Sequence, residues 1–124
     1  MRHLSKSRQR EKHEADPRRQ EFRESFHACW LCNQPATDIH EMTPGGGRRR
    51  GYQERATWIR ACRSCHDECL QPFAGLWTLA GQLAIKARFD PEYYDRELVL
   101  AIKGRANTAV TEPEVIAAAW DLAL

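Results

Sequence analysis

Apolar residues recur with a helical period in the last third of the chain. Between Phe73 and Ala87 they follow the 3.6-residue period of one helix face, and Pro72 stands where a first helical turn tolerates proline. A second such stretch starts at Asp90-Pro91 and stops at Gly104, a residue typical of helix C-termini. The pattern therefore predicts one helix ending before Asp90 and another over about 91–103.

A third helix is predicted by a capping box. The residues Thr111-Glu112-Pro113-Glu114 place a hydroxyl and a carboxylate at the spacing that satisfies the first backbone N–H groups, so a helix should run to about Leu122. Residues 71–124 are thus expected to form a helical extension packed on the rest, with Trp77 and Trp120 in a core or at an interface.

The first residues show the opposite pattern. Residues 1–21 are almost wholly polar, and residues 1–28 carry a net charge of +3, against −2 for residues 71–124. Too little apolar surface is available there to offset the entropy of ordering the chain. Residues 1–25 are expected to be a basic arm, disordered or loosely helical, and any polyanionic partner should meet the first two thirds of the chain.

Residues 26–70 hold all the cysteines. Cys29-x-x-Cys32 and Cys62-x-x-Cys65 are two knuckles whose thiolates can close a tetrahedral zinc site. A metal would supply the staple that a chain of 124 residues with a modest core needs. Cys69 is interpreted as a packing residue on a helix.

Composition supports the reading of these cysteines as metal ligands. The chain has 124 residues, a length that suits one domain. Of these, 42% are hydrophobic and 29% are charged, and the net charge is +2. Neither a membrane-spanning apolar run nor a secretory signal is evident, so a cytoplasmic protein with reduced thiols and no membrane partner is expected.

A glycine- and arginine-rich segment lies between the knuckles. It reads Pro44-Gly-Gly-Gly-Arg-Arg-Arg-Gly51 and is expected to be a flexible cationic loop suited to a phosphate backbone. Candidate phosphate-binding side chains here and further along are Arg48, Arg49, Arg50, Arg55, Arg60 and Arg63.

The order of these motifs resembles the HNH endonuclease family in its four-cysteine, zinc-bearing form. The resemblance covers about residues 27–70: a Cys-x-x-Cys knuckle, the run Asp38-Ile-His-Glu-Met-Thr-Pro44, the Gly/Arg loop, and a second knuckle followed at once by His66. It implies an α+β fold with a ββα-metal core, in which two strands and a helix hold a catalytic divalent ion.

The resemblance also assigns roles. Aligning the family's proline with Pro44 puts His40 at a metal-ligand position and Glu41 at the general-base position, while His66 gives the second ligand. Glutamate replaces the usual histidine base, and with an ordinary pKa of about 4.3 it is a weak base at neutral pH.

A second alignment of the same residues remains open. In it His40 is the base, and Asp38 and His66 hold the ion, because Asp38 and His40 share a face of a regular strand. The asparagine that braces the loop in the family is missing, and Thr57 is the nearest polar substitute.

The resemblance implies a metal-dependent DNA endonuclease that nicks or cleaves duplex DNA. It would carry a structural Zn²⁺ and use Mg²⁺ or another divalent cation, with DNA as partner and phage packaging proteins as a further candidate class. Two alternatives stay open: a catalytically degenerate zinc module that binds nucleic acid or a protein, and a zinc-stapled protein whose helical tail packs on a partner.

Overall fold

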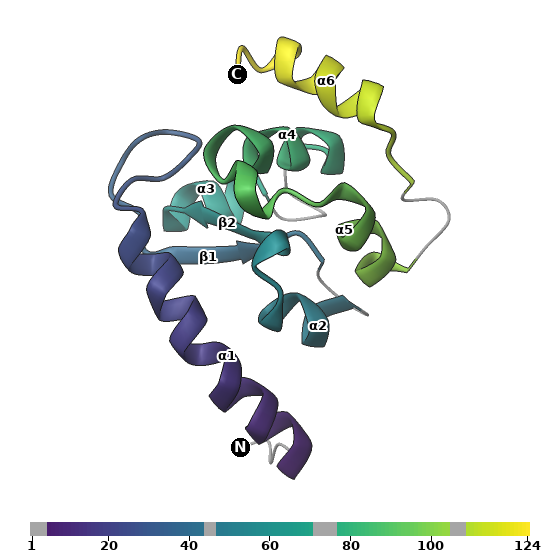
Figure 1. The fold of residues 1–124 in the computed structure, drawn as a ribbon. Helices are drawn as coiled ribbons and strands as arrows, with labels where there is room; N and C mark the ends of the chain where they lie inside the picture. Colours follow the sequence, from purple (N-terminus) through teal and green to yellow (C-terminus); the bar gives the residue numbers. More distant parts are fainter. Residues whose placement is uncertain (1–4, 44–46, 71–76, 105–108) are drawn as a thin grey trace.

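The computed structural model describes residues 5–43, 47–70, 77–104 and 109–124. It is an α+β structure, mostly helical, with one two-stranded antiparallel sheet (Figure 1). None of the described helices has the length and apolar content needed to cross a membrane. In chain order the elements are α1 Lys6–Ser25, β1 Asp38–Glu41, α2 Arg48–Gln53, η2 Arg55–Thr57, β2 Trp58–Ala61, α3 Arg63–Glu68, α4 Leu79–Phe89, η3 Pro91–Tyr93, α5 Arg96–Lys103 and α6 Glu112–Asp121.

The two faces of the sheet contact different helices. In the antiparallel register His40 pairs with Ile59 and Glu41 with Trp58, and directly paired residues share a face. The face with Glu41 and Trp58 meets α1, through Arg19 and Phe22. The face with His40 meets α3 and α4. The sheet is therefore covered on both sides, and all four residues of β2 are buried.

Helix α1 covers residues 6–25 of the basic arm, which was expected to be disordered or loosely helical. Ser5 caps it by accepting a hydrogen bond from the backbone N–H of Arg8. Ala15, Arg19 and Phe22 lie on one helix face and are buried, so three positions at spacings of four and three residues attach a mostly polar helix. The composition of this segment did not indicate the attachment, because only two of the three buried residues are apolar.

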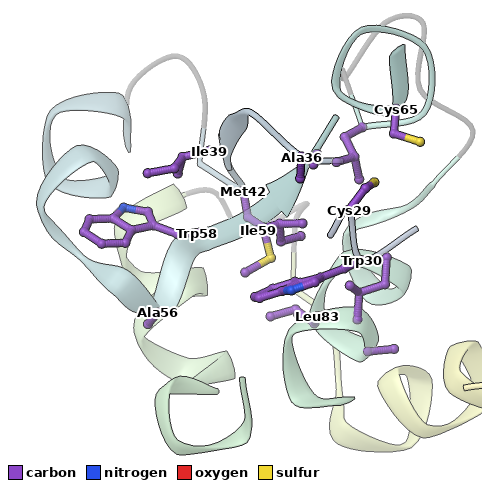
Figure 2. Packing of buried hydrophobic residues seen from close by; sticks show 14 of the residues in the cluster. Cys29, Trp30, Ala36, Ile39, Met42, Ala56, Trp58, Ile59, Cys65 and Leu83 are labelled. Atoms are coloured by element: carbon purple, nitrogen blue, oxygen red, sulfur yellow. The ribbon is translucent and has the colours of Figure 1, made fainter. Parts of the chain in front are cut away.

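Aromatic side chains from distant parts of the chain form the centre of the core. Phe22 lies 5.7 Å from Trp30 and 5.5 Å from Trp58, measured between ring centroids. Trp30 in turn stacks on Phe89 at 5.6 Å. Figure 2 shows Trp30 beside Leu83, with Ile59 and Met42 close by. These contacts join α1, the first knuckle, the sheet and α4 into one core.

A buried ionic cluster ties α4 to the start of β2. The ammonium of Lys86, which is fully buried, donates to the backbone carbonyls of Arg55 at 2.7 Å and Trp58 at 2.8 Å and to the Asp90 carboxylate at 2.7 Å. Arg55 donates two further hydrogen bonds to Asp90, each 3.2 Å long. Burial lowers the pKa of Lys86 to about 8, against the pull of Asp90 in the other direction.

The predicted helix ends in the last third are confirmed where the structure describes them. α4 ends at Phe89, Gly104 terminates α5 with a φ of 70°, and the Thr111 hydroxyl caps α6. The expected start at Pro72 lies outside the described residues, but the helix is shorter than predicted, because the Thr78 hydroxyl caps α4 and the helix begins only at Leu79. The helix expected from Pro91 is divided, because η3 turns first and the Asp95 side chain then caps α5.

The two tryptophans of this region differ in burial. Trp77 packs partly buried against the core, whereas Trp120 is 81% exposed on α6. Helix α6 lies against α4 (Figure 1), through the side that carries the buried Val115. The outward side of α6 therefore presents the indole of Trp120 to solvent.

The arginine-rich segment is helical rather than a flexible loop. Residues 44–46 lie outside the description, and α2 begins directly after Gly47. Gly51 is enclosed at the end of this helix, where its carbonyl accepts hydrogen bonds from the Thr57 hydroxyl at 2.9 Å and the Trp58 indole at 2.7 Å. A Cβ added at Gly51 would lie 2.2 Å from the Thr43 hydroxyl oxygen.

Gly51→Ala is therefore expected to destabilise the fold by about 1–3 kcal/mol, the usual cost of overpacking. Removing the Thr43 hydroxyl should relieve the clash, because the next contacts of the added Cβ are 3.5 and 3.6 Å away. Chemical denaturation of Gly51→Ala in the wild-type and Thr43→Ala backgrounds measures the difference. Equal costs in both backgrounds would contradict the steric explanation.

Candidate metal centre

Two tight turns bring four cysteines together. In the first knuckle the N–H of Asn33 donates to the carbonyl of Cys29, and Asn33 takes a left-handed φ of 63°. The N–H of Leu31 also donates to the Cys29 sulfur at 3.4 Å. In the second knuckle Cys62 caps α3, and its sulfur accepts from the N–H of Cys65 at 3.4 Å. Each turn thus directs its two cysteine sulfurs toward those of the other turn.

The sulfurs have the spacing of a structural zinc site. The four ligand atoms of Cys29, Cys32, Cys62 and Cys65 all lie within 4.8 Å of one another. The Cys32 and Cys62 sulfurs are 3.7 Å apart, close to the roughly 3.8 Å between sulfurs in a tetrahedron with Zn–S bonds of about 2.3 Å. Figure 2 shows Cys29 and Cys65 together at one edge of the core. A four-thiolate donor set closed in this way fits zinc.

Backbone N–H groups favour the thiolate form of one of the four ligands, Cys29. Burial disfavours the Cys29 thiolate, but hydrogen bonds from the backbone of Cys62, Cys32 and Leu31 outweigh it and lower the pKa of Cys29 to about 7. Zinc binds the thiolate form, so a lowered thiol pKa reduces the cost of deprotonation.

The fifth cysteine stands apart from this group. Cys69 is the residue after α3, partly buried against the core.

Within the described ranges the four-cysteine set is the only group of three or more His, Cys, Asp or Glu side chains whose ligand atoms lie this close together. Asp38, His40 and His66 therefore do not form a second such cluster, although they are neighbours.

The imidazoles of His40 and His66 meet edge to face. His40 comes from β1 and His66 from α3, and their ring centroids lie 5.2 Å apart with an angle of 70° between the planes. The second knuckle is responsible for this arrangement, because it turns the chain from β2 directly into α3. His40 is 3% exposed, whereas the side chain of His66 is 22% exposed.

Asp38 orients His66. The Asp38 carboxylate lies 3.1 Å from His66 Nδ1 and also pairs with the Arg63 guanidinium at 3.2 Å. A carboxylate only accepts, so Nδ1 of His66 carries a proton and Nε2 is left as the acceptor or ligand nitrogen of the neutral ring. A carboxylate behind one imidazole nitrogen is the common arrangement of metal-bound histidines.

Gln82 of α4 orients His40. Its amide nitrogen donates to the carbonyl of Leu70 at 3.4 Å, which leaves the amide oxygen to accept from His40 Nε2 at 3.0 Å. His40 therefore carries its proton on Nε2, and Nδ1 keeps a free lone pair. Burial lowers the pKa of His40 to about 4, so the ring is neutral at pH 7.

Glu41 lies on the other face of β1. Successive residues of a strand point to opposite sides, and the Glu41 carboxylate pairs with Arg19 of α1 at 3.2 Å. The guanidinium of Arg19 is itself stacked on the Tyr52 ring, 3.9 Å from its centroid. The structure thus separates Glu41 from the imidazoles of His40 and His66 and gives it a partner in the helix packing.

Thr57 connects the elements that precede β2. Its fully buried hydroxyl lies 2.9 Å from the carbonyls of both Gly51 and Glu54, and its own carbonyl accepts from the N–H of Met42 at 2.8 Å. Thr57, the polar residue nearest to the position where the resemblance expects an asparagine, thus holds together the described part of the segment between β1 and β2.

The six candidate phosphate-binding arginines differ in burial and in their partners. Arg60 is buried and donates to the backbone carbonyls of Phe26, Ala36 and Asp38, so it holds the first knuckle against the sheet. Three others have carboxylate partners: Arg55 pairs with Asp90, Arg49 with Glu11 and Arg63 with Asp38. Arg48 and Arg50 are exposed on α2, and the side chain of Arg63 is 74% exposed despite its partner.

Two residues that shape the site were missed in the sequence. Gln82 lies 42 positions after His40 on a helix interpreted only as core, and Arg19 lies 22 positions before Glu41 in the arm expected to be disordered or loosely helical. A polar Gln among the apolar positions of α4 was the one local signal.

Comparison of the chain with protein-family models, with curated proteins and with solved structures finds no significant match.

Proposed function

We propose that the chain is a metal-dependent DNA endonuclease of the HNH type, which hydrolyses phosphodiester bonds. The order of β1, β2 and α3, with a four-cysteine cluster at the turn into α3, supports the proposal. The observation that carries it is the pair of oriented imidazoles: His40 and His66 lie 5.2 Å apart between ring centroids, and each has one nitrogen engaged and one free.

The residues of the proposed centre divide the work. His40 Nδ1 and His66 Nε2 are the nitrogens that would hold a divalent ion, and Asp38 and Gln82 fix the tautomers that leave these nitrogens free. A divalent ion supplies Lewis-acid stabilisation of the negative charge that develops on a phosphate during hydrolysis. Imidazole donors suit Ni²⁺ better than Mg²⁺ or Mn²⁺, so Ni²⁺ fits this site better.

Glu41 has a structural role in this proposal. Its carboxylate faces α1 and pairs with Arg19 at 3.2 Å, which favours neither proton transfer at the imidazole face nor contact with a phosphate there. Glu41→Gln is therefore expected to retain nicking activity, which separates this proposal from one in which Glu41 is the base.

Nicking of a supercoiled plasmid tests the function. The zinc-loaded protein is assayed with Mg²⁺, Mn²⁺ and Ni²⁺, beside His66→Ala and His40→Ala. The matched control is His13→Ala, a change of an exposed histidine on α1. The proposal expects loss of nicking in the two site variants, as when a group that acts directly on the reaction is removed, and retained nicking in the control. Equal activity in all of them would mean a contaminating nuclease and would contradict the proposal.

A second function is favoured by the position of Glu41. If the family's base position has been taken over by a contact with Arg19, the same fold would be a zinc module that binds nucleic acid without cleaving it. Salt-dependent DNA binding, together with no cleavage by any of the three ions, would select this function.

Exposed arginines of α2 give a separate prediction for DNA binding. Arg48→Ala and Arg50→Ala should each weaken binding at all sequences and reduce the slope of log affinity against log salt concentration by about 0.9, the loss of one phosphate contact. Arg49→Ala should change the slope less, because Glu11 already neutralises that guanidinium at 2.6 Å. Fluorescence anisotropy of a labelled duplex at several salt concentrations measures the slopes. An equal change for all three variants would show that the Glu11 pair has no effect.

A further inference from the structure

A cavity of about 230 Å³ opens beside His40. It lies between the sheet, the start of α4 and the end of α5, so it is formed by segments distant in sequence. Its described lining residues are His40, Met42, Leu70, Trp77, Thr78, Leu79, Gln82 and Lys103. His40 belongs both to the cavity lining and to the proposed metal centre, and Gln82 orients it. The other lining residues belong neither to that centre nor to the four-cysteine cluster.

The polar side of the cavity suits an anion. Lys103 is the only charged side chain among the described lining residues. Its charge is close enough to act on His40, whose protonation it opposes. The amide of Gln82 is already engaged with His40 and Leu70. An incoming anion would therefore meet a positive charge in the cavity lining.

The other side of the cavity suits a flat ring. Met42 and Leu70 are buried and form an apolar wall, and Trp77 and Leu79 are partly buried beside them. All four bases can stack on an aromatic side chain, because every base has a π-face. A volume of 230 Å³ is below the roughly 300–1,000 Å³ of sites that enclose drug-sized ligands, so the cavity has room for one nucleotide unit at most, part of which stays outside it.

We propose that this cavity binds one nucleotide of the DNA strand beside the cleaved phosphate, with its base against Trp77 and its phosphate at Lys103. The inference rests on the proposed function for the identity of the strand. Binding of the nucleotide unit itself depends only on the cavity. Trp77 and Lys103 are accordingly positioning residues that hold the strand while the imidazoles of the neighbouring centre face the scissile bond.

The test uses thymidine 5′-monophosphate with the zinc-loaded protein and no other divalent ion, so that no cleavage is needed. Amide shifts in ¹⁵N-labelled protein report binding, with thymidine and inorganic phosphate as separate ligands. The proposal expects saturable shifts at Leu79 and Gln82 with the nucleotide, weaker binding of thymidine, and weakest binding of phosphate. Trp77→Leu and Lys103→Gln should each raise the dissociation constant at least fivefold, a size typical of a lost stacking partner.

Trp120→Leu is the matched control for Trp77→Leu, because Trp120 is 81% exposed on α6 and is not among the described lining residues. An unchanged dissociation constant in Trp77→Leu, or phosphate binding as tightly as the nucleotide, would overturn the proposal. The two proposals fail separately. Nucleotide binding without nicking would contradict only the endonuclease, and nicking without nucleotide binding would contradict only the cavity's role.

Discussion

Cys65→Ser is expected to lower zinc affinity by more than about 100-fold and to leave the chain largely unfolded. Changes next to a metal ligand cost about 10- to 100-fold in affinity, and loss of a ligand should cost more. In zinc-finger peptides, zinc contributes about 10–16 kcal/mol of apparent binding free energy, and folding depends on it. Here the cluster joins the first knuckle to α3, and Cys65 is buried at the edge of the core.

Competition with a chromophoric chelator measures the affinity, and circular dichroism measures the helix content before and after chelation. Cys69→Ser is the matched control, since Cys69 lies outside the four-cysteine group. It should bind one zinc per chain with wild-type affinity and fold. One zinc bound to Cys65→Ser with unchanged affinity would show that the cluster is not the metal site.

Lys86→Met is expected to destabilise the zinc-loaded protein by about 3–5 kcal/mol, the cost of removing one partner of a buried ion pair. The ammonium is fully buried, and its three hydrogen bonds go to Asp90 and to the carbonyls of Arg55 and Trp58. Methionine fills the same volume but donates no hydrogen bond, so both carbonyls lose their donor. Arg55 alone then faces the Asp90 carboxylate.

The chain contains its own control for this effect. Lys12 and Asp16 form a pair of the same i,i+4 spacing on α1, but their side chains are 51% and 48% exposed. Exposed pairs of this kind contribute about 0.3–0.5 kcal/mol, so Lys12→Met should cost far less than Lys86→Met. Urea denaturation of both variants gives the comparison. A loss below about 1 kcal/mol in Lys86→Met would contradict a structural role for the buried cluster.

Local signals in the sequence predicted local structure well. The spacing within each Cys-x-x-Cys pair and the single glycine at the end of α5 act over a few residues, so the pattern alone indicates the knuckles and the helix end. The cap of α6 by Thr111 belongs to the same class. These predictions needed no knowledge of how distant segments pack.

Long-range contacts explain what the sequence did not indicate. Arg19 pairs with Glu41 across 22 positions, and Gln82 bonds to His40 across 42. No periodic pattern marks either contact, because a single polar side chain on a helix gives no signal about its distant partner. The choice between the two alignments of the His-Glu strand depends on such contacts, as does the division of the arginines into buried and exposed groups.

His40 and Glu41 are adjacent in β1, but their side chains lie on opposite faces of the sheet. His40 faces α3 and α4, and Glu41 faces α1. A deletion of one residue between Cys32 and Asp38 that slid β1 by one position would exchange these environments. Glu41 would then take the place of His40 beside His66, and Met42 would take the place of Glu41 opposite Arg19. Length variation in this connecting segment is therefore expected to be poorly tolerated, even though much of the segment is exposed to solvent.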